Sequence, residues 1–177
     1  MRRQSFEALW SLFAYATKPA KEMTESFSAL AHLRPLLPNE GPFRVIHVGD
    51  GAHARTAALF ALKTQAENIS VDPNVHEQLV GRWRDRFGIR RLAWRRARIQ
   101  DVAEEIAAMA PMPLFATFVH AHVDVDWALA QLPWTAAFTL ACCCPGKQLT
   151  RVHAVHAEGD DLSVLSEHRH YQVLVAP

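Results

Sequence analysis

The chain has 177 residues, a length that suits one domain and is short for two. Half of the residues are apolar and 21% are charged, a balance that excludes a disordered or fibrous chain and predicts a globular fold. The formal net charge is only +1, so any attraction to nucleic acid has to come from a local patch of basic residues.

The first forty residues predict two helices. Ser5 is placed to cap a helix over 6–16, and apolar residues recur at helical spacing over 21–37. We therefore expect 1–40 to form an N-terminal helical extension and 41–177 to form the main domain. The apolar side chains of the first helix either help to cover a crevice of that domain or dock on a protein partner; they are Phe6, Leu9, Trp10 and Phe13.

Neither a signal peptide nor a membrane span is predicted, because the apolar residues near the N-terminus are spaced for one helix face. The three cysteines are adjacent, at 142–144, and adjacent cysteines do not form the separated pairs of a secreted disulfide framework. An intracellular location is the expectation.

From residue 43 onward, short apolar runs alternate with amphipathic stretches. Alternation of this kind predicts a mainly parallel sheet with helices on both faces. The expected strands are 43–48, 68–72, 92–99, 114–120 and 136–142; the expected helices are 55–64, 75–87, 102–109 and 127–132; and 151–156 with 171–176 are expected to form a hairpin around Gly159-Asp160-Asp161. The predicted fold class is α/β, a Rossmann-like three-layer sandwich with a seven-stranded sheet that ends in an antiparallel hairpin.

A two-glycine loop follows the first of these strands. Gly49, Asp50 and Gly51 lie between that strand and a helix, which is the setting of a nucleotide-binding loop. Glycines allow a sharp turn and a close approach to a ligand, and the helix N-terminus offers unpaired N–H groups. The alternative interpretation is an ordinary tight turn between strand and helix.

Two acidic residues favour the binding site over the turn. Asp72 ends the second predicted strand, 21 residues after Gly51, where a carboxylate accepts hydrogen bonds from ribose hydroxyls. Asp101 follows the third predicted strand and is placed to accept a hydrogen bond from an adenine amino group. Taken singly, the two residues are also explained by an Asp-Pro turn and a helix cap.

This order of glycine loop, Asp72, Asp101 and short fourth strand resembles the class I S-adenosylmethionine-dependent methyltransferases, over about 43–176. Three further segments are similar to tRNA ribose 2′-O-methyltransferases with His-Ala-Cys-Gly-Asp and Cys-Cys-Tyr-His patterns: 18–22, 120–124 and 142–144. The resemblance implies S-adenosylmethionine as cofactor, bound by His47, Gly49, Asp50, Gly51, Asp72, Asp101 and His120.

The chain also departs from the family pattern. Members usually carry an acidic residue where His47 stands and a third glycine where His53 stands. The alternative is therefore a catalytically inactive domain that serves as a scaffold or binding subunit in a larger ribonucleoprotein or protein assembly. A different nucleotide-dependent enzyme, such as a reductase, is a third option, since the architecture alone does not fix the ligand.

Three residues after the fourth predicted strand are the candidates for catalysis: His120, His122 and Asp124. An imidazole there is suited to remove a proton from the methyl acceptor, because its ordinary pKa lies near neutrality. The alternative is that both histidines only satisfy backbone groups of a loop.

The cysteine run at 142–144 has two interpretations. With neighbouring histidines it resembles a set of soft metal ligands, but it lacks Cys-x-x-Cys spacing. We interpret these cysteines as small buried apolar residues, and no metal site is predicted.

Between Arg82 and Arg98, eight arginines are interleaved with aromatic residues. Arginine pairs with phosphates, and aromatic faces stack on bases, so RNA is the predicted partner of this segment and the predicted methyl acceptor. A solvated helix face or a protein-binding surface explains the same pattern.

Overall fold

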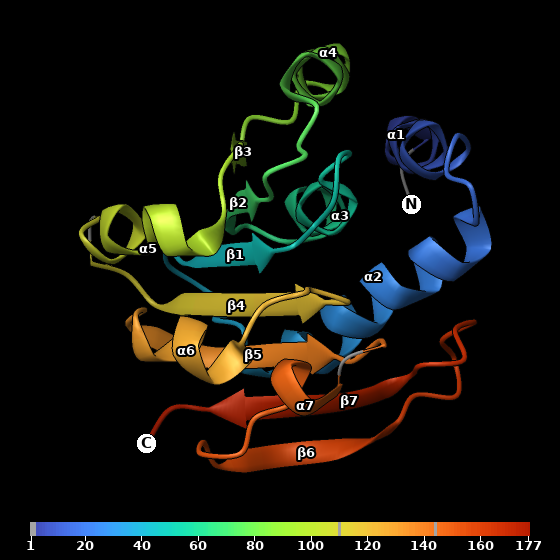
Figure 1. The fold of residues 1–177 in the computed structure, drawn as a ribbon. Helices are drawn as coiled ribbons and strands as arrows, with labels where there is room; N and C mark the ends of the chain where they lie inside the picture. Colours follow the sequence, from blue (N-terminus) through green and yellow to red (C-terminus); the bar gives the residue numbers. More distant parts are fainter. Residues whose placement is uncertain (1–2, 110, 144) are drawn as a thin grey trace.

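The computed structural model describes residues 3–109, 111–143 and 145–177. It confirms the predicted α/β class: a seven-stranded sheet lies between two layers of helices (Figure 1). None of the helices in the described part of the chain is both long and apolar enough to span a membrane. The elements are α1 (Arg3–Phe13), α2 (Pro19–Leu33), the 3₁₀ helix η1 (Arg34–Leu36), β1 (Arg44–Val48), α3 (Arg55–Lys63), β2 (Glu67–Val71), α4 (Glu77–Phe87), β3 (Leu92–Arg95), α5 (Ile99–Ala107), β4 (Leu114–Val119), α6 (Val125–Ala130), β5 (Trp134–Leu140), α7 (Pro145–Gln148), β6 (Val155–Asp160) and β7 (His170–Val175).

The strand order is β3-β2-β1-β4-β5-β7-β6. Strands β1 to β5 are parallel, whereas β7 runs antiparallel to β5 and β6 runs antiparallel to β7. The order reverses between β1 and β4, which are neighbours at the centre of the sheet. Open α/β sheets bind ligands outside the carboxyl ends of the strands at such a reversal.

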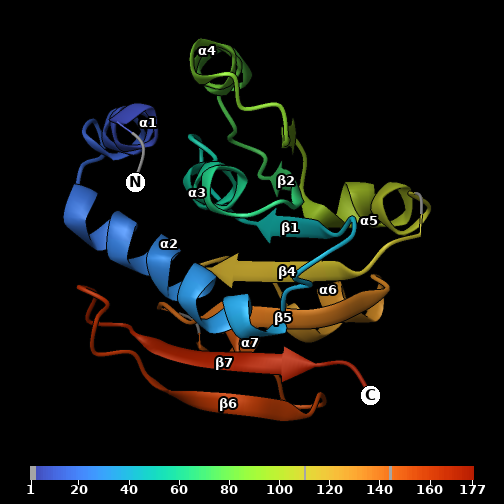
Figure 2. The same cartoon turned by 180° about the vertical axis from the view of Figure 1, so that it is seen from behind.

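Side chains alternate between the two faces of the sheet and create a core on each. In β1, Val45 belongs to the core that α1, α2, α3 and α4 share, and Ile46 belongs to the core under α5 and α6. Figure 2 shows α2 and α3 in front of one face, and Figure 1 shows α5 and α6 in front of the other. Every residue of β1 is buried, as expected for a central parallel strand.

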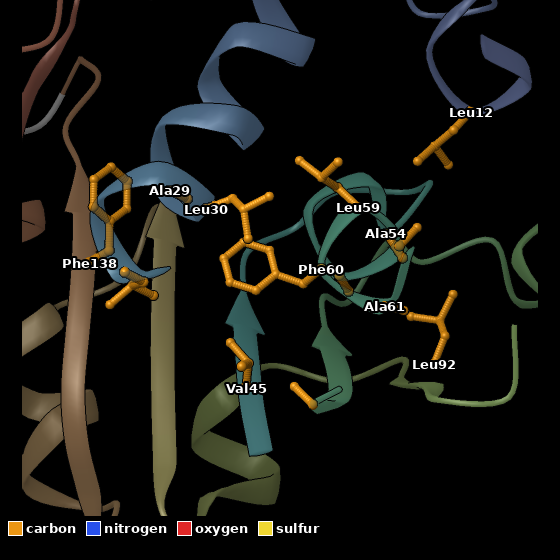
Figure 3. Packing of buried hydrophobic residues seen from close by; sticks show 14 of the residues in the cluster. Leu12, Ala29, Leu30, Val45, Ala54, Leu59, Phe60, Ala61, Leu92 and Phe138 are labelled. Carbon is orange, nitrogen blue, oxygen red and sulfur yellow. The ribbon is translucent and has the colours of Figure 1, made fainter. Parts of the chain in front are cut away.

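The N-terminal helices pack into the same core as the main domain. Leu9 and Phe13 of α1 are buried there, and Leu30 of α2 points toward Phe60 of α3 (Figure 3). Pro19 begins α2, two residues before the predicted start, because proline suits the first turn of a helix. A protein partner at α1 would therefore meet the exposed Phe6 and Trp10, while Leu9 and Phe13 are covered.

Two predicted strands end at least two residues earlier in the structure. The third strand was expected over 92–99 but stops at Arg95, because Ile99 begins α5, whose buried residues recur at helical spacing. The fifth strand was expected to reach Cys142 but stops at Leu140. As a result, Asp101 lies inside a helix and Cys142 lies in a loop.

The predicted hairpin is also displaced. Gly159 and Asp160 are part of β6, and the chain turns at Asp161, whose carboxylate accepts hydrogen bonds from Ser28 and Ser163. Strand β6 lies at the edge of the sheet, and its residues are exposed or half-buried. An edge strand with so few buried residues gives little hydrophobic alternation, which explains the wrong boundary.

Candidate functional site

The glycine loop lies at the carboxyl end of β1 and touches the segment that follows β4. Gly49 has a φ of 69°, and a Cβ atom added to it would lie 2.8 Å from the Ala121 Cβ and 2.9 Å from the Ala121 Cα. Gly51 also has a positive φ, of 72°, but the space around it is open. Glycine is therefore required at 49 by both conformation and space, and at 51 by conformation alone.

Asp50 occupies the N-terminus of α3. Its carboxylate accepts hydrogen bonds from the amides of Thr56 and Ala57, at 2.9 and 3.0 Å. Burial raises the pKa of Asp50 to about 6, and these hydrogen bonds act in the opposite direction. Two of the helix amides that were expected to be open to a ligand are thus used by the protein itself.

Asp72 follows β2, as predicted, and is buried against the glycine loop. Its Oδ2 accepts a hydrogen bond from the Gly51 amide at 2.9 Å, and its Oδ1 accepts one from the Asn74 amide at 2.7 Å. The carboxylate therefore fixes the end of β2 to the loop after β1. Each oxygen has a second lone pair with which it can meet a hydroxyl.

A cavity of about 410 Å³ lies outside the carboxyl ends of β1, β2 and β4, within the size range of ligand sites. Gln100 lines it, but Asp101 does not: Asp101 is exposed in the first turn of α5. The lining residues are Val48, Gly49, Val71, Asp72, Pro73, Asn74, Ala97, Arg98, Ile99, Gln100, His120, Ala121, His122 and Val123.

A second cavity of about 170 Å³ adjoins the first, and the two share Gly49 and His120. Its far wall comes from α2, which supplies Glu22, Glu25 and Ser26. The remaining lining residues are Asp50, Gly51, Ala52, Arg55, Thr56 and Val119. Glu25 and Ser26 were not predicted to be site residues, whereas Glu22 belongs to the segment 18–22 that resembles the ribose methyltransferases. Glu25 and Ser26 lie on the buried side of the amphipathic helix α2, and polar residues in such positions could have indicated a site.

His120 stands between the two cavities. It is the first residue after β4 and has a φ of 52°, an uncommon conformation for a side chain other than glycine. Its Nδ1 lies 3.4 Å from Oε1 of the buried Glu25, while its Nε2 is buried and has no hydrogen-bond partner among the described residues. Burial lowers the pKa of His120, and the Glu25 carboxylate and a hydrogen bond with the His168 backbone partly offset that effect. Lys21, whose Nζ lies 2.6 Å from the same Glu25 oxygen, lowers the pKa further.

His47 has a different environment from the one predicted. It is completely buried in β1 and lines neither cavity. Its Nε2 donates to Asn68 Oδ1 at 3.1 Å, and its Nδ1 lies 2.8 Å from the Thr117 hydroxyl. Burial lowers the pKa of His47 to about 3, so the ring is neutral and joins β1 to its two neighbouring strands.

The other two candidates for catalysis, His122 and Asp124, have different positions in the structure. Asp124 caps α6, where its carboxylate accepts a hydrogen bond from the Trp127 amide. His122 is exposed and lines the larger cavity.

The cysteine run is not buried in the described part of the chain. Cys142 is half-buried and Cys143 is exposed, because β5 ends before them; Cys144 lies outside the described residues. The interpretation of 142 and 143 as buried apolar residues was therefore wrong. The Cys142 Sγ lies 3.8 Å from both the His122 Nε2 and the Cys143 Sγ.

The arginine-rich segment begins on α4, which carries Arg82, Arg84 and Arg86, and its later arginines lie at or near the two ends of β3. Arg90 and Arg91 precede β3 and lie at the amino edge, where Arg91 donates to Gln65 and to the Thr64 carbonyl. Arg96 and Arg98 follow β3 and are exposed at the carboxyl edge, where Arg98 lines the larger cavity. Only this second group adjoins the candidate site.

No protein-family model and no curated protein matches the sequence. Solved structures do share its fold. They include the bifunctional kinase-methyltransferase WbdD, at 18% identity and a TM-score of 0.54, over 90% of this chain and 40% of that one. They also include MtNAS in complex with S-adenosylmethionine, at 11% identity and a TM-score of 0.57, over 99% and 73% of the two chains.

A third similar structure is a Klebsiella pneumoniae protein assigned as an O-methyltransferase, with 9% identity, a TM-score of 0.55 and coverage of 100% of this chain and 91% of that one. The chain spans about 40% of the WbdD chain that it matches. At these identities the similarity establishes the fold: the chain has the Rossmann-like fold of class I methyltransferases.

Proposed function

We propose that the protein binds S-adenosylmethionine across the two adjoining cavities and transfers its methyl group to RNA. The observation that carries the proposal is that both cavities share Gly49 and His120, at the point where the strand order reverses. MtNAS, which has the same fold, has been solved with S-adenosylmethionine, and this supports the choice of ligand.

The residues present fit the two ends of this cofactor. The larger cavity offers the Asp72 carboxylate to ribose hydroxyls and the apolar Ile99 to a purine ring. The smaller cavity is lined by the Glu22 and Glu25 carboxylates, which are suited to the ammonium of an amino acid. It is also lined by Arg55, whose guanidinium pairs with Glu22 in this structure and would have to exchange that partner for a ligand carboxylate. Because Gly49 has no side chain, Ala121 of the larger cavity can pack directly against the loop that both cavities share.

The bound cofactor would supply an activated methyl group on a sulfonium, and the protein would hold and deprotonate the acceptor. His120 is suited to the second task. Its Nε2 is a buried nitrogen without a described partner, and its other nitrogen faces the Glu25 carboxylate. A carboxylate on one side of an imidazole orients the ring and stabilises the charge that it gains when it accepts a proton.

RNA is the proposed acceptor because of the arginines at the same edge of the sheet. Arg96 and Arg98 are exposed, and their guanidinium groups are suited to hold phosphates next to the larger cavity. The resemblance of 120–124 to ribose 2′-O-methyltransferases supports a hydroxyl as the acceptor group. Such a hydroxyl has to lose a proton during transfer, which agrees with the role proposed for His120.

The proposal is tested by calorimetric titration with S-adenosylmethionine, its demethylated product S-adenosylhomocysteine, and NAD⁺. We expect both S-adenosylmethionine and S-adenosylhomocysteine to bind. Asp72→Asn should weaken the binding of both by at least about tenfold, because a charged hydrogen-bond acceptor is lost. Asp101→Asn is the matched control, since its exposed carboxylate lies outside the cavity. Preferential binding of NAD⁺, or equal losses in the two variants, would contradict the proposal.

A scaffold function is the second candidate, and one observation favours it. Asp50 already fills the N-terminus of α3, so the loop is closed by the protein's own carboxylate. If no nucleotide binds in the titration while the chain still binds RNA, the scaffold function replaces the enzyme.

A further inference from the structure

We infer that His122, Cys142 and Cys143 form a binding site for a thiophilic divalent cation such as Zn²⁺. The three side chains each offer one ligand atom, and these atoms all lie within 4.8 Å of one another. The residues come from the loops after β4 and β5, which are neighbouring strands. The site does not depend on the proposed methyl transfer.

The spacing agrees with the geometry of zinc. With Zn–S bonds of about 2.3 Å and Zn–N bonds of about 2.0–2.1 Å, a tetrahedral ion holds two sulfurs about 3.8 Å apart and a sulfur and a nitrogen about 3.6 Å apart. The Cys142 Sγ lies 3.8 Å from the Cys143 Sγ and 3.8 Å from the His122 Nε2. Two of the three edges of a tetrahedral face are therefore already formed.

A buried side chain holds the central ligand in place. Gln148 is 1% exposed; its Oε1 accepts a hydrogen bond from the Cys142 amide at 2.7 Å, and its Nε2 donates to the Ala121 carbonyl at 2.8 Å. The same Nε2 lies 2.9 Å from the Cys142 Sγ. Gln148 thus ties the two loops together and orients the sulfur, as outer-shell residues do in metal sites.

The chemistry of the ligands selects the class of ion. Two sulfurs and one imidazole favour Zn²⁺ and disfavour the hard cations Mg²⁺ and Ca²⁺, which prefer oxygen. Binding requires both thiols as thiolates, so up to two protons pass to the buffer for each ion bound. Three protein ligands leave a fourth position for a solvent molecule, next to the larger cavity that His122 lines.

The test is a titration of the reduced, chelator-treated full chain with Co²⁺, in the absence of any nucleotide. We expect a thiolate-to-cobalt charge-transfer band that saturates at one ion per chain, disappears on addition of Zn²⁺, and persists with excess Mg²⁺. Cys142→Ser and Cys143→Ser should remove the band, and His122→Ala should weaken binding by at least about tenfold. His156→Ala, at an exposed histidine on β6, is the control and should bind as the wild type does.

A second measurement separates lost binding from lost folding. Zn²⁺ should protect Cys142 and Cys143 of the wild type from alkylation, as read by mass spectrometry of the peptides. Gln148→Met keeps all three ligands and is expected to weaken Zn²⁺ binding by about 10–100-fold. Absence of a stoichiometric band in the wild type, or an unchanged band in both serine variants, would overturn the assignment.

Discussion

His47 and His120 lie on or next to the two central strands of the sheet, yet their surroundings are opposite. Both ring nitrogens of His47 have side-chain partners, and the ring is closed off from both cavities. His120 lines both cavities, and one of its nitrogens is buried without a partner among the described residues. A histidine whose nitrogens are both satisfied supports the fold, whereas the unsatisfied nitrogen of His120 is the reason for proposing a ligand there.

A similar contrast separates the glycine loop from the loops that follow β4 and β5. On the glycine-loop side, Asp50 and Asp72 are bound to backbone amides, which fixes the loop before any ligand arrives. On the β4 and β5 side, His122, Cys142 and Cys143 are at least partly accessible. The first region is therefore a preformed wall, whereas the side chains of the second are accessible to solvent.

The largest effect is expected from the acid sensitivity of His47. Its pKa in the folded protein, about 3, lies below its ordinary value of 6.5, so the unfolded chain binds more protons between these pH values. The stability that this difference contributes is complete above pH 6.5 and is lost as the pH falls toward 3, by roughly 5 kcal/mol in all.

The measurement is chemical denaturation of wild type and His47→Gln at a series of pH values. Asp50 has the opposite tendency, because its raised pKa favours the folded state at low pH. The difference in free energy of unfolding between wild type and variant isolates the contribution of His47. This difference should decrease steadily as the pH falls below 6.5. A constant difference would show that His47 is not a neutral buried group.

A second large effect is expected on catalysis at His120. If this residue is the base, His120→Asn should lower kcat for RNA methylation by roughly 100- to 10,000-fold. The Kd for S-adenosylmethionine should change much less than kcat, although His120 also lines both cavities. Because burial lowers the pKa of His120, the wild-type rate should be level near neutral pH and fall only below pH 6.5. An equal loss in the exposed control His156→Ala would exclude this role.

The two glycines of the loop provide a comparison of intermediate size. Gly49→Ala should lower the free energy of unfolding by roughly 2–5 kcal/mol. The alanine would have to adopt a left-handed conformation, and its Cβ would also clash with Ala121. Gly51→Ala also forces a left-handed conformation but causes no clash, so it should lower the free energy of unfolding by only about 1–2 kcal/mol. If urea denaturation gave the same loss of stability for both variants, Ala121 would have moved aside without an energetic penalty.

The smallest effect is expected from the arginines. Replacing Arg96 and Arg98 with alanine should reduce the salt dependence of RNA binding by about one released ion for each arginine. Replacing Arg90 and Arg91, at the opposite edge of the sheet, should change it less. The reverse ranking in fluorescence titrations at several salt concentrations would move the RNA site away from the cavities.

The fold was largely predictable from the sequence, because buried parallel strands and amphipathic helices have distinct patterns. The position of Asp72 after β2 could also be predicted, since a strand end and its following turn are adjacent in the chain. The role of Asp101 was harder to assign: a difference of four residues at the end of β3 moves it into α5 and out of the cavity lining.

Contacts between distant segments could not be predicted. Glu25 approaches His120 only because α2 crosses the carboxyl ends of the strands, and no spacing rule joins these two positions. The cluster of His122 with Cys142 depends on the register of β4 and β5 and on the early end of β5. A chain read in one dimension contains the residues of such a site but not their distances.

The two adjoining cavities are proposed to form one cofactor site. The most direct measurement compares S-adenosylmethionine with methylthioadenosine, which lacks the amino acid end, and with free methionine, by calorimetry on the wild-type chain. We expect S-adenosylmethionine to bind at least about tenfold more tightly than either fragment, because only it fills both cavities. Equal affinity for S-adenosylmethionine and methylthioadenosine, or no binding of either, would contradict the proposal.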